Sequence, residues 1–335
     1  MKRIFFVLII SSVCLVLSKK GEAFWLTGPE MFSAPITTPR SQGAPESTNP
    51  LFILTADSFM DDEGKPTRVS GADFSHGEGV VTAMGQEFQN ILQKNPHLPY
   101  TLLQLVTFDG KTLALYDRDG PVTDPQKIPQ GARRIVVFLA DIPGEKQEGG
   151  RWQFSGDAVY KTLVDALEQL KQMKAAVIVN LSMSAGEQAP ILEELMRTYK
   201  DVLFVASADG YPGKYAESLS NVLAVGNLGD KTPQPNTIYA EGYVEIPGKG
   251  SARGSSFAVP KAVMTAALAW QVNGNINSGQ LREIIVAPTL EANADPPGRL
   301  NSQASLEMAK NYTPSFFPVW GSPSFDFHQP FGFLW

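Results

Sequence analysis

Three residues of types that together perform nucleophilic catalysis lie where predicted elements end or begin. Asp57 closes an apolar run in ILTADSF, His76 opens a helical pattern in SHGEGVV, and Ser256 opens another in ARGSSFAVP. A nucleophilic serine needs a base within hydrogen-bond reach, and that base needs a carboxylate to orient it. Taken singly, each residue has an ordinary explanation as a turn or cap residue. Taken jointly, they suggest acyl-transfer chemistry.

Apolar strands alternate with amphipathic helices over most of the chain, and this order would position the three residues. The pattern predicts a mostly parallel central sheet with helices on both faces, an α/β fold of three layers. Function in such sheets gathers at the carboxyl ends of the strands. The predicted strands are 51–56, 100–108, 134–140, 175–181, 202–206 and 221–226, and the predicted helices are 76–93, 157–173, 189–199, 256–272 and 278–286.

The composition narrows the kinds of site and partner to expect. Of 335 residues, 28 are basic and 34 acidic, which gives a net charge of −6 and no electrostatic footprint for nucleic acid. The chain has one Cys and three His, so neither a disulfide within the chain nor a multi-Cys metal site can form. We therefore predict no nucleic-acid partner, no metal and no cofactor.

The N-terminal residues have the features of a targeting signal. Lys2 and Arg3 precede an apolar run at 4–17, and small residues at Gly21 and Ala23 suit a cleavage site. We expect a signal peptide at 1–23 and an exported protein, either secreted or held in the periplasm or cell envelope. The alternative is an uncleaved anchor, although the run is shorter than the ~20 residues that span a membrane.

The motifs around the three residues resemble those of the subtilisin-like serine proteases. The family's Asp motif is Asp-Ser/Thr-Gly, and this chain has Asp57-Ser58-Phe59. The family's His motif is His-Gly-Thr-His-Val-Ala-Gly, and this chain has HGEGVV from His76. The family's Ser motif is Gly-Thr-Ser-Met-Ala-x-Pro, and this chain has GSSFAVP from Gly254, the most specific of the three matches. The resemblance covers about Leu51 to Leu290 and implies a subtilisin-like fold.

The resemblance also implies a role for each residue in an exported serine endopeptidase with a polypeptide substrate. Ser256 would attack the scissile carbonyl, His76 would transfer the proton, and Asp57 would orient the imidazole. Asp209 aligns with the asparagine that donates a hydrogen bond to the oxyanion. Substrate would add as an extended strand along three residues of the stretch that is similar to the family's substrate-lining Asn-x-Ser strand: Leu181, Ser182 and Met183.

Several departures from the family pattern support a rival interpretation. Phe59 replaces a glycine, Gly79 replaces the second histidine, and Asp209 can donate to an oxyanion only when protonated. The rival is a catalytically weak or inactive member of the fold that binds partners through its peptide groove or its C-terminal tail.

The chain is predicted to divide into four segments. These are the signal peptide at 1–23, a Pro/Ser-rich lead-in at 24–50, the peptidase domain at 51–290, and a Pro/aromatic-rich extension at 291–335. Two interpretations of the charge-poor tail at 314–335 stay open. Its rings either pack on the domain or form a contact surface for a protein or a membrane.

Overall fold

The computed structural model describes the predicted peptidase domain and the helix that follows it. The described residues are 51–59, 69, 71–107, 111–142, 155–173, 176–183, 190–230, 234, 236–290 and 298–312, with the backbone of short strands at 7–9, 14–16, 145–146 and 152–153. Apart from those short strands, the predicted signal peptide and lead-in lie outside the described residues, as does the tail at 314–335.

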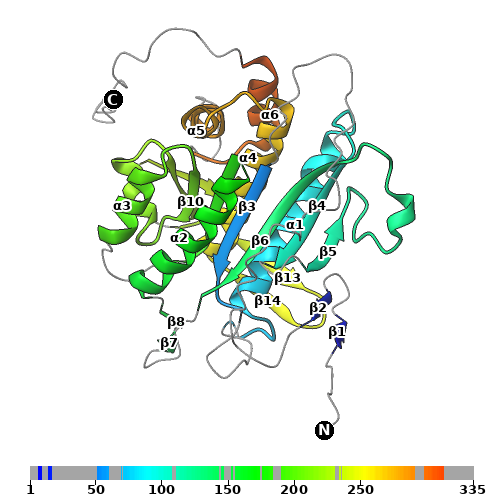
Figure 1. Cartoon of the computed structure of the whole chain (residues 1–335), viewed down its shortest axis with the longest axis horizontal. Helices are drawn as coiled ribbons and strands as arrows, with labels where there is room; N and C mark the ends of the chain where they lie inside the picture. Colours follow the sequence, from blue (N-terminus) through cyan, green and yellow to red (C-terminus); the bar gives the residue numbers. More distant parts are fainter. Residues whose placement is uncertain are drawn as a thin grey trace, which may run out of the picture.

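An eight-stranded sheet forms the centre of the molecule (Figure 1), in the order β12-β11-β10-β9-β3-β6-β4-β5. Every neighbouring pair is parallel except β4 and β5. The strand bounds are β3 (Leu51–Asp57), β4 (Thr101–Thr107), β5 (Thr112–Tyr116), β6 (Arg133–Asp141), β9 (Ala176–Leu181), β10 (Leu203–Ser207), β11 (Val222–Asn227) and β12 (Thr237–Ala240).

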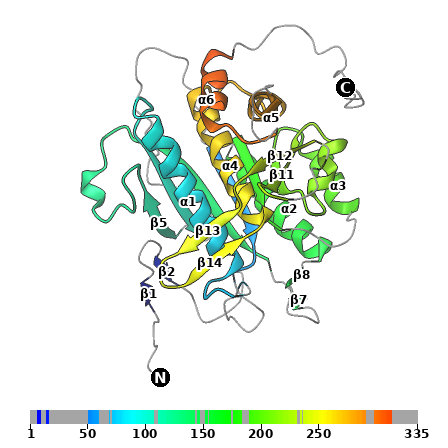
Figure 2. The same cartoon turned by 180° about the vertical axis from the view of Figure 1, so that it is seen from behind.

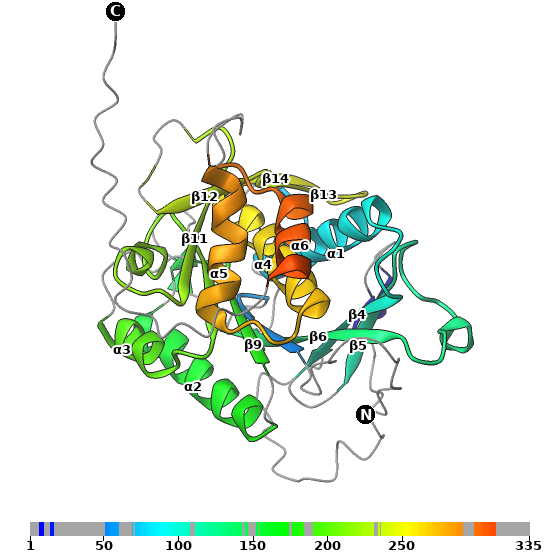
Figure 3. The same ribbon diagram turned by 90° about the horizontal axis from the view of Figure 1, so that it is seen from above.

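Helices cover both faces of this sheet (Figure 3), each face with its own hydrophobic core. One face carries α1 (His76–Lys94), α4 (Ser255–Val272), α5 (Ser278–Val286) and α6 (Ser302–Asn311), and the other carries α2 (Gly156–Gln172) and α3 (Pro190–Thr198). The predicted α/β fold, a mostly parallel sheet between two helical layers, is confirmed.

The burial of each element explains its sequence pattern. Strands β3, β10 and β11 are buried along their whole length, as expected for parallel strands covered on both faces. Helix α2 buries one stripe that includes Leu163 and Leu167, so it lies at the surface. Helix α4 is buried nearly all round and forms the central helix of its layer. No helix formed by the described residues is long and apolar enough to cross a membrane.

Short elements complete the fold. A hairpin of β13 (Tyr243–Ile246) and β14 (Gly250–Arg253) leads into α4 and is seen most clearly from behind (Figure 2). The remaining elements are the antiparallel pairs β1 (Val7–Ile9) with β2 (Cys14–Val16) and β7 (Glu145–Lys146) with β8 (Trp152–Gln153), and the 3-10 turns η2 (Pro125–Lys127), η3 (Gly213–Glu217) and η4 (Ala287–Leu290).

Helix α6 lies within the segment that the sequence analysis treats as an extension. Its residues Leu306 and Ala309 belong to the core that also contains α4. The hydroxyls of Ser302 and Thr265 lie 2.8 Å apart and join the two helices. This part of the extension is therefore packed into the domain.

Candidate functional site

Asp57 is the last residue of β3 and is fully buried. Its Oδ1 accepts hydrogen bonds from the Ser58 backbone N–H (2.7 Å) and lies 2.7 Å from His76 Nδ1. Its Oδ2 has no hydrogen-bond partner among the described residues. A buried carboxylate needs such donors, so the His76 contact is a main source of compensation for its charge.

His76 is the first residue of α1, and the local sequence fixes that start. The Ser75 hydroxyl caps the helix by accepting from the Glu78 N–H at 3.1 Å. The Gly77 N–H donates to the Ser58 carbonyl at 2.9 Å, which ties the helix start to the end of β3. A quarter of the His76 side chain stays exposed (25%). Its ring is thus held by Asp57 on one side and open to a ligand on the other.

The pKa of His76 is raised above its ordinary value of 6.5. Burial lowers this pKa, but the charge of Asp57 and the hydrogen bond to it raise the pKa by more than burial lowers it. Because Nδ1 faces the carboxylate, the remaining nitrogen Nε2 is the one left to act as a base.

Ser256 is the second residue of α4 and is partly exposed. The residue before the helix, Gly254, has no side chain with which to cap it, and the start of α4 has no side-chain cap hydrogen bond. The ring of Phe257 lies 5.4 Å from the ring of His76. This contact brings the first turn of α4 against the first turn of α1. The side chain of Ser256 forms no hydrogen bond with another described residue.

Each of the two glycines near the start of α1 makes room for an aromatic ring. A Cβ on Gly77 would lie 2.6 Å from Phe59, and a Cβ on Gly79 would lie 2.8 Å from both Phe257 and Phe74. Phe59 and Gly79 are the departures in the Asp and His motifs. In this chain they are accommodated by packing: Phe59 lies on Gly77, and Phe257 occupies the space that Gly79 leaves.

Asp209 lies just after β10, is exposed, and accepts a hydrogen bond from the Ser255 hydroxyl. Ser255 is buried, and its hydroxyl also lies 2.7 Å from that of Ser207. Ser255 directly precedes Ser256. It therefore links Asp209 to the first turn of α4. The role of Asp209 toward an oxyanion stays a prediction.

The three predicted substrate residues follow one another at the end of β9, and their side chains are buried. Leu181 pairs with Ala206 of β10, while Ser182 and Met183 lie beyond the strand. The Ser182 hydroxyl donates to Asn180 Oδ1 at 3.1 Å. The Asn180 Nδ2 is buried without a partner among the described residues. Contact of Ser182 and Met183 with a peptide, through their backbone, stays a prediction.

The sequence analysis missed two contacts that support the site. Asp141 ends β6 in register with Asp57, and its Oδ1 accepts from the Phe59 N–H at 2.9 Å. Lys249, in the turn of the β13–β14 hairpin, forms a 2.9 Å ion pair with Glu78 of α1. An acidic residue directly after a predicted strand was a usable signal for Asp141. No local pattern signals the pairing of Lys249 with a residue so distant in sequence.

The described part of the chain holds no group of three or more His, Cys, Asp or Glu side chains placed to bind a metal ion.

No protein-family model matches the chain, and no curated protein matches its sequence. Solved structures do match it. The prenylagaramide maturation protease PagA is 18% identical, with a TM-score of 0.46 over 78% of this chain and 94% of PagA. The patellamide maturation protease PatA is 21% identical, with a TM-score of 0.44 over 79% of this chain and 99% of PatA.

A third solved structure is the A-subunit of the AB5 toxin from E. coli. It is 14% identical, with a TM-score of 0.48 over 78% of this chain and 93% of the toxin subunit. These likenesses concern the fold alone. In its fold, the chain is similar to solved protease domains and to this toxin subunit.

Proposed function

We propose that the chain is an exported serine endopeptidase of the subtilisin-like type, with Asp57, His76 and Ser256 as its triad. The 2.7 Å contact between His76 Nδ1 and the buried carboxylate of Asp57 is the observation that carries this proposal. Ser256 follows at the open N-terminus of α4, beside the residue whose ring packs on His76. The proposal thus assigns to one triad residues from three distant parts of the chain.

In the proposed reaction, the Ser256 hydroxyl attacks the carbonyl carbon of a peptide bond while His76 Nε2 takes its proton. The amide groups at the start of α4 stabilise the oxyanion that forms. When the C–N bond breaks, His76 gives the proton to the leaving amine, and the acyl group stays on Ser256 as an ester. Water, activated by His76, then hydrolyses the ester and restores the hydroxyl. Asp57 stabilises the imidazolium throughout.

The substrate of this reaction is a polypeptide. Its acyl part would lie against the backbone of Ser182 and Met183, at the carboxyl end of β9. Export is proposed on the N-terminal pattern at 1–23, where a basic pair, an apolar run and small residues follow one another.

Labelling by a fluorophosphonate probe tests the activated serine. The full chain without residues 1–23 is expected to form a covalent adduct, because the probe reacts with serines that a nearby base activates, here His76 as proposed. The Ser256→Ala variant should not label. The matched control is Ser220→Ala, an exposed serine in the turn before β11, which should label as the unmodified protein does.

Peptide mapping of the adduct would place the label on Ser256. A folded protein whose labelling is the same in Ser256→Ala would refute the triad. A folded protein that never labels, and cleaves no denatured protein substrate, would favour the binding-protein alternative.

A further inference from the structure

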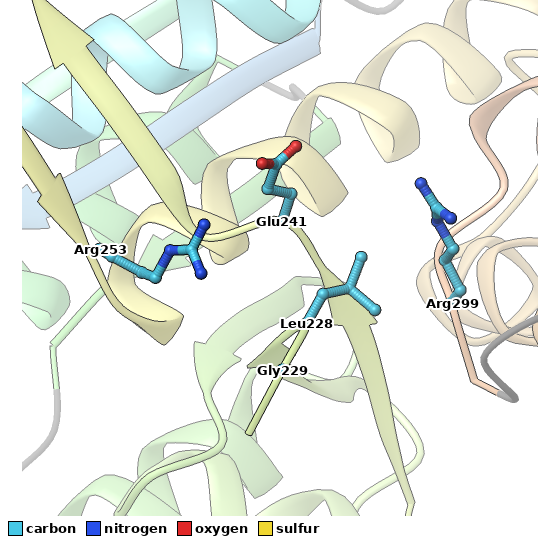
Figure 4. Close-up of a pocket in the computed structure, with 5 residues that line it drawn as sticks. All are labelled: Leu228, Gly229, Glu241, Arg253 and Arg299. Atoms are coloured by element: carbon cyan, nitrogen blue, oxygen red, sulfur yellow. The ribbon is translucent and has the colours of Figure 1, made fainter. Parts of the chain in front are cut away.

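A pocket of about 420 Å³ lies at the carboxyl ends of β11 and β12 (Figure 4). Two of its residues follow β11 directly, and one follows β12. The other two are arginines from the end of β14 and from the segment beside β12. The full set is Leu228, Gly229, Glu241, Arg253 and Arg299. Figure 4 shows the arginines on opposite sides, with Glu241 and Leu228 between them.

The pocket lies next to the proposed nucleophile. Arg253 precedes Ser256 by three residues. Since an extended chain spans at most ~3.6 Å per residue, their Cα atoms are within about 11 Å of each other. The backbone between them is anchored, because the Gly254 N–H donates to the Gly242 carbonyl at 2.8 Å. The pocket is therefore near enough to Ser256 for one substrate to reach both.

The charges of the pocket favour an anion. Two arginines and one glutamate line it, for a net charge of +1. Within the described residues, neither guanidinium has an ion-pair partner. Guanidinium groups bind carboxylates through paired N–H donors. A single carboxylate would thus neutralise the pocket.

The side chain of Arg253 and the backbone beside Arg299 are both held before any ligand binds. The Arg253 guanidinium lies 6.0 Å from the centre of the Tyr243 ring, its cross-strand neighbour in the hairpin. Around Arg299, the Gly298 carbonyl accepts from the Tyr239 N–H at 2.8 Å and the Leu300 N–H donates to the Tyr239 carbonyl at 2.7 Å. A side chain that already packs on a neighbour, as Arg253 does on Tyr243, loses less conformational entropy when a ligand binds.

We infer that this pocket binds an acidic side chain of the polypeptide substrate, in the segment that follows the cleaved bond and leaves as the amine. The inference rests on the proposed function. The order of the strands in the sheet supports binding of the segment that follows the cleaved bond. The acyl part is proposed to lie at β9, whereas the pocket lies at β11 and β12, with β10 and Asp209 between them. A peptide that crosses Ser256 from β9 would carry its leaving part toward the two arginines.

Paired fluorogenic peptides test the inference. They differ only by Glu or Gln at one position, placed in turn at each of the first few positions after the cleaved bond. The unmodified protein should prefer Glu at one position by about threefold to tenfold in kcat/KM, the range for partly exposed charge pairs. Arg253→Gln and Arg299→Gln should each reduce this preference, measured as the ratio of kcat/KM for the Glu peptide to that for the Gln peptide. Glu241→Gln should increase it, because that substitution removes the repelling charge.

Arg197→Gln is the matched control, since Arg197 lies on α3 and pairs with Glu193. It should leave the Glu preference unchanged. Equal kcat/KM for Glu and Gln at every position would overturn the inference and leave the protease proposal standing. Absence of both cleavage and labelling would overturn the protease proposal itself.

Binding supplies a measurement that needs no turnover. The Ser256→Ala variant should bind a fluorescent Glu peptide more tightly than the Gln peptide, by anisotropy, and added salt should weaken the difference. The double variant Ser256→Ala/Arg253→Gln should lose it. Equal affinities of Ser256→Ala for the two peptides would also overturn the inference.

Discussion

Gly79 of α1 leaves the space that the ring of Phe257 occupies at the start of α4. A Cβ at Gly79 would lie 2.8 Å from the Phe257 ring and equally close to Phe74. Gly79→Ala should therefore displace a ring and cost about 1–3 kcal/mol of unfolding free energy, the usual cost of overpacking a core. Because Phe257 follows Ser256 directly, the rate of fluorophosphonate labelling should fall as well. Urea unfolding and labelling kinetics measure the two effects.

Gly85 offers a control on the same helix. A Cβ there would lie 3.8 Å from Tyr116, an ordinary contact distance. Gly85→Ala should stabilise the protein by up to about 1 kcal/mol through helix propensity and leave labelling unchanged. Equal effects of the two substitutions would contradict the packing explanation.

The raised pKa of His76 predicts how activity depends on pH. A general base must be neutral, so the labelling rate should fall as the pH drops through a pKa above 6.5. Asp57→Asn removes the carboxylate that orients the imidazole and fixes its tautomer, so its residual labelling should be slower by on the order of 10⁴. Labelling that is equally fast from acid to mildly alkaline pH would contradict the role of His76.

The same pKa predicts a stability effect with a definite sign. Because the folded protein holds the His76 proton more tightly than the unfolded chain does, protonated His76 stabilises the fold. The stabilisation is complete below the ordinary pKa of 6.5 and is lost as pH rises through the folded-state pKa. Unfolding free energies of the unmodified protein and His76→Gln should therefore differ more in mild acid than in mild alkali. A pH-independent difference would count against the Asp57 contact.

The hydroxyl of Ser255 is expected to position Asp209. Ser255→Ala would remove the donor to Asp209 and the partner of Ser207 together. We expect a fall of about tenfold in kcat, the range for losing one hydrogen bond to a charged group, with little change in KM. Ser255→Thr retains a hydroxyl and should recover most of the rate. A Thr variant as slow as the Ala variant would indicate a packing role instead.

The ion pair between Lys249 and Glu78 should stabilise the contact of the hairpin with α1. Both side chains are largely buried, at 17% and 9% exposed. Lys249→Met would leave the Glu78 charge without its partner and should cost on the order of 2 kcal/mol, less than the cost for a fully buried pair. The double variant Lys249→Met/Glu78→Gln should recover much of that loss.

The exposed pair of Arg197 and Glu193 provides the comparison for this ion pair. Arg197→Gln should change the unfolding free energy by about 0.5 kcal/mol or less. If Lys249→Met changed the unfolding free energy, measured in urea, as little as Arg197→Gln does, the ion pair would not stabilise the contact of the hairpin with α1.

Six of the eight strands of the main sheet and the helices α1 to α5 were predictable because each has a clear apolar pattern, whereas β12 and α6 were not predicted. Residues 76–93 were predicted as a helix and α1 spans His76–Lys94, while 51–56 were predicted as a strand and β3 spans Leu51–Asp57. Short or exposed elements carry little of this signal. The edge strand β5 and the hairpin β13–β14 were not predicted, since they bury only part of their residues.

In the candidate site, too, some residues were predictable from the sequence and others were not. Asp57 and His76 lie at element ends that the sequence marks, and the structure brings them to hydrogen-bond distance. The pocket around Arg253 and Arg299 depends on a hairpin and on a segment beside β12. The hairpin pairs two short, half-exposed strands, and the segment beside β12 pairs with a residue distant in sequence, so neither arginine is marked by a local pattern.

The backbone bonds between residues 298–300 and Tyr239 have a consequence for solubility. Strand β12 is the outermost strand of the sheet on its side, and an open strand edge can pair with a second molecule. The Tyr239 N–H and carbonyl are both engaged by Gly298 and Leu300, so this part of the edge is covered by the chain itself. By covering this edge, the segment that carries Arg299 also prevents the edge from pairing with a second molecule, which would lead to aggregation. Loosening it should therefore promote self-association as well as change the affinity for acidic peptides.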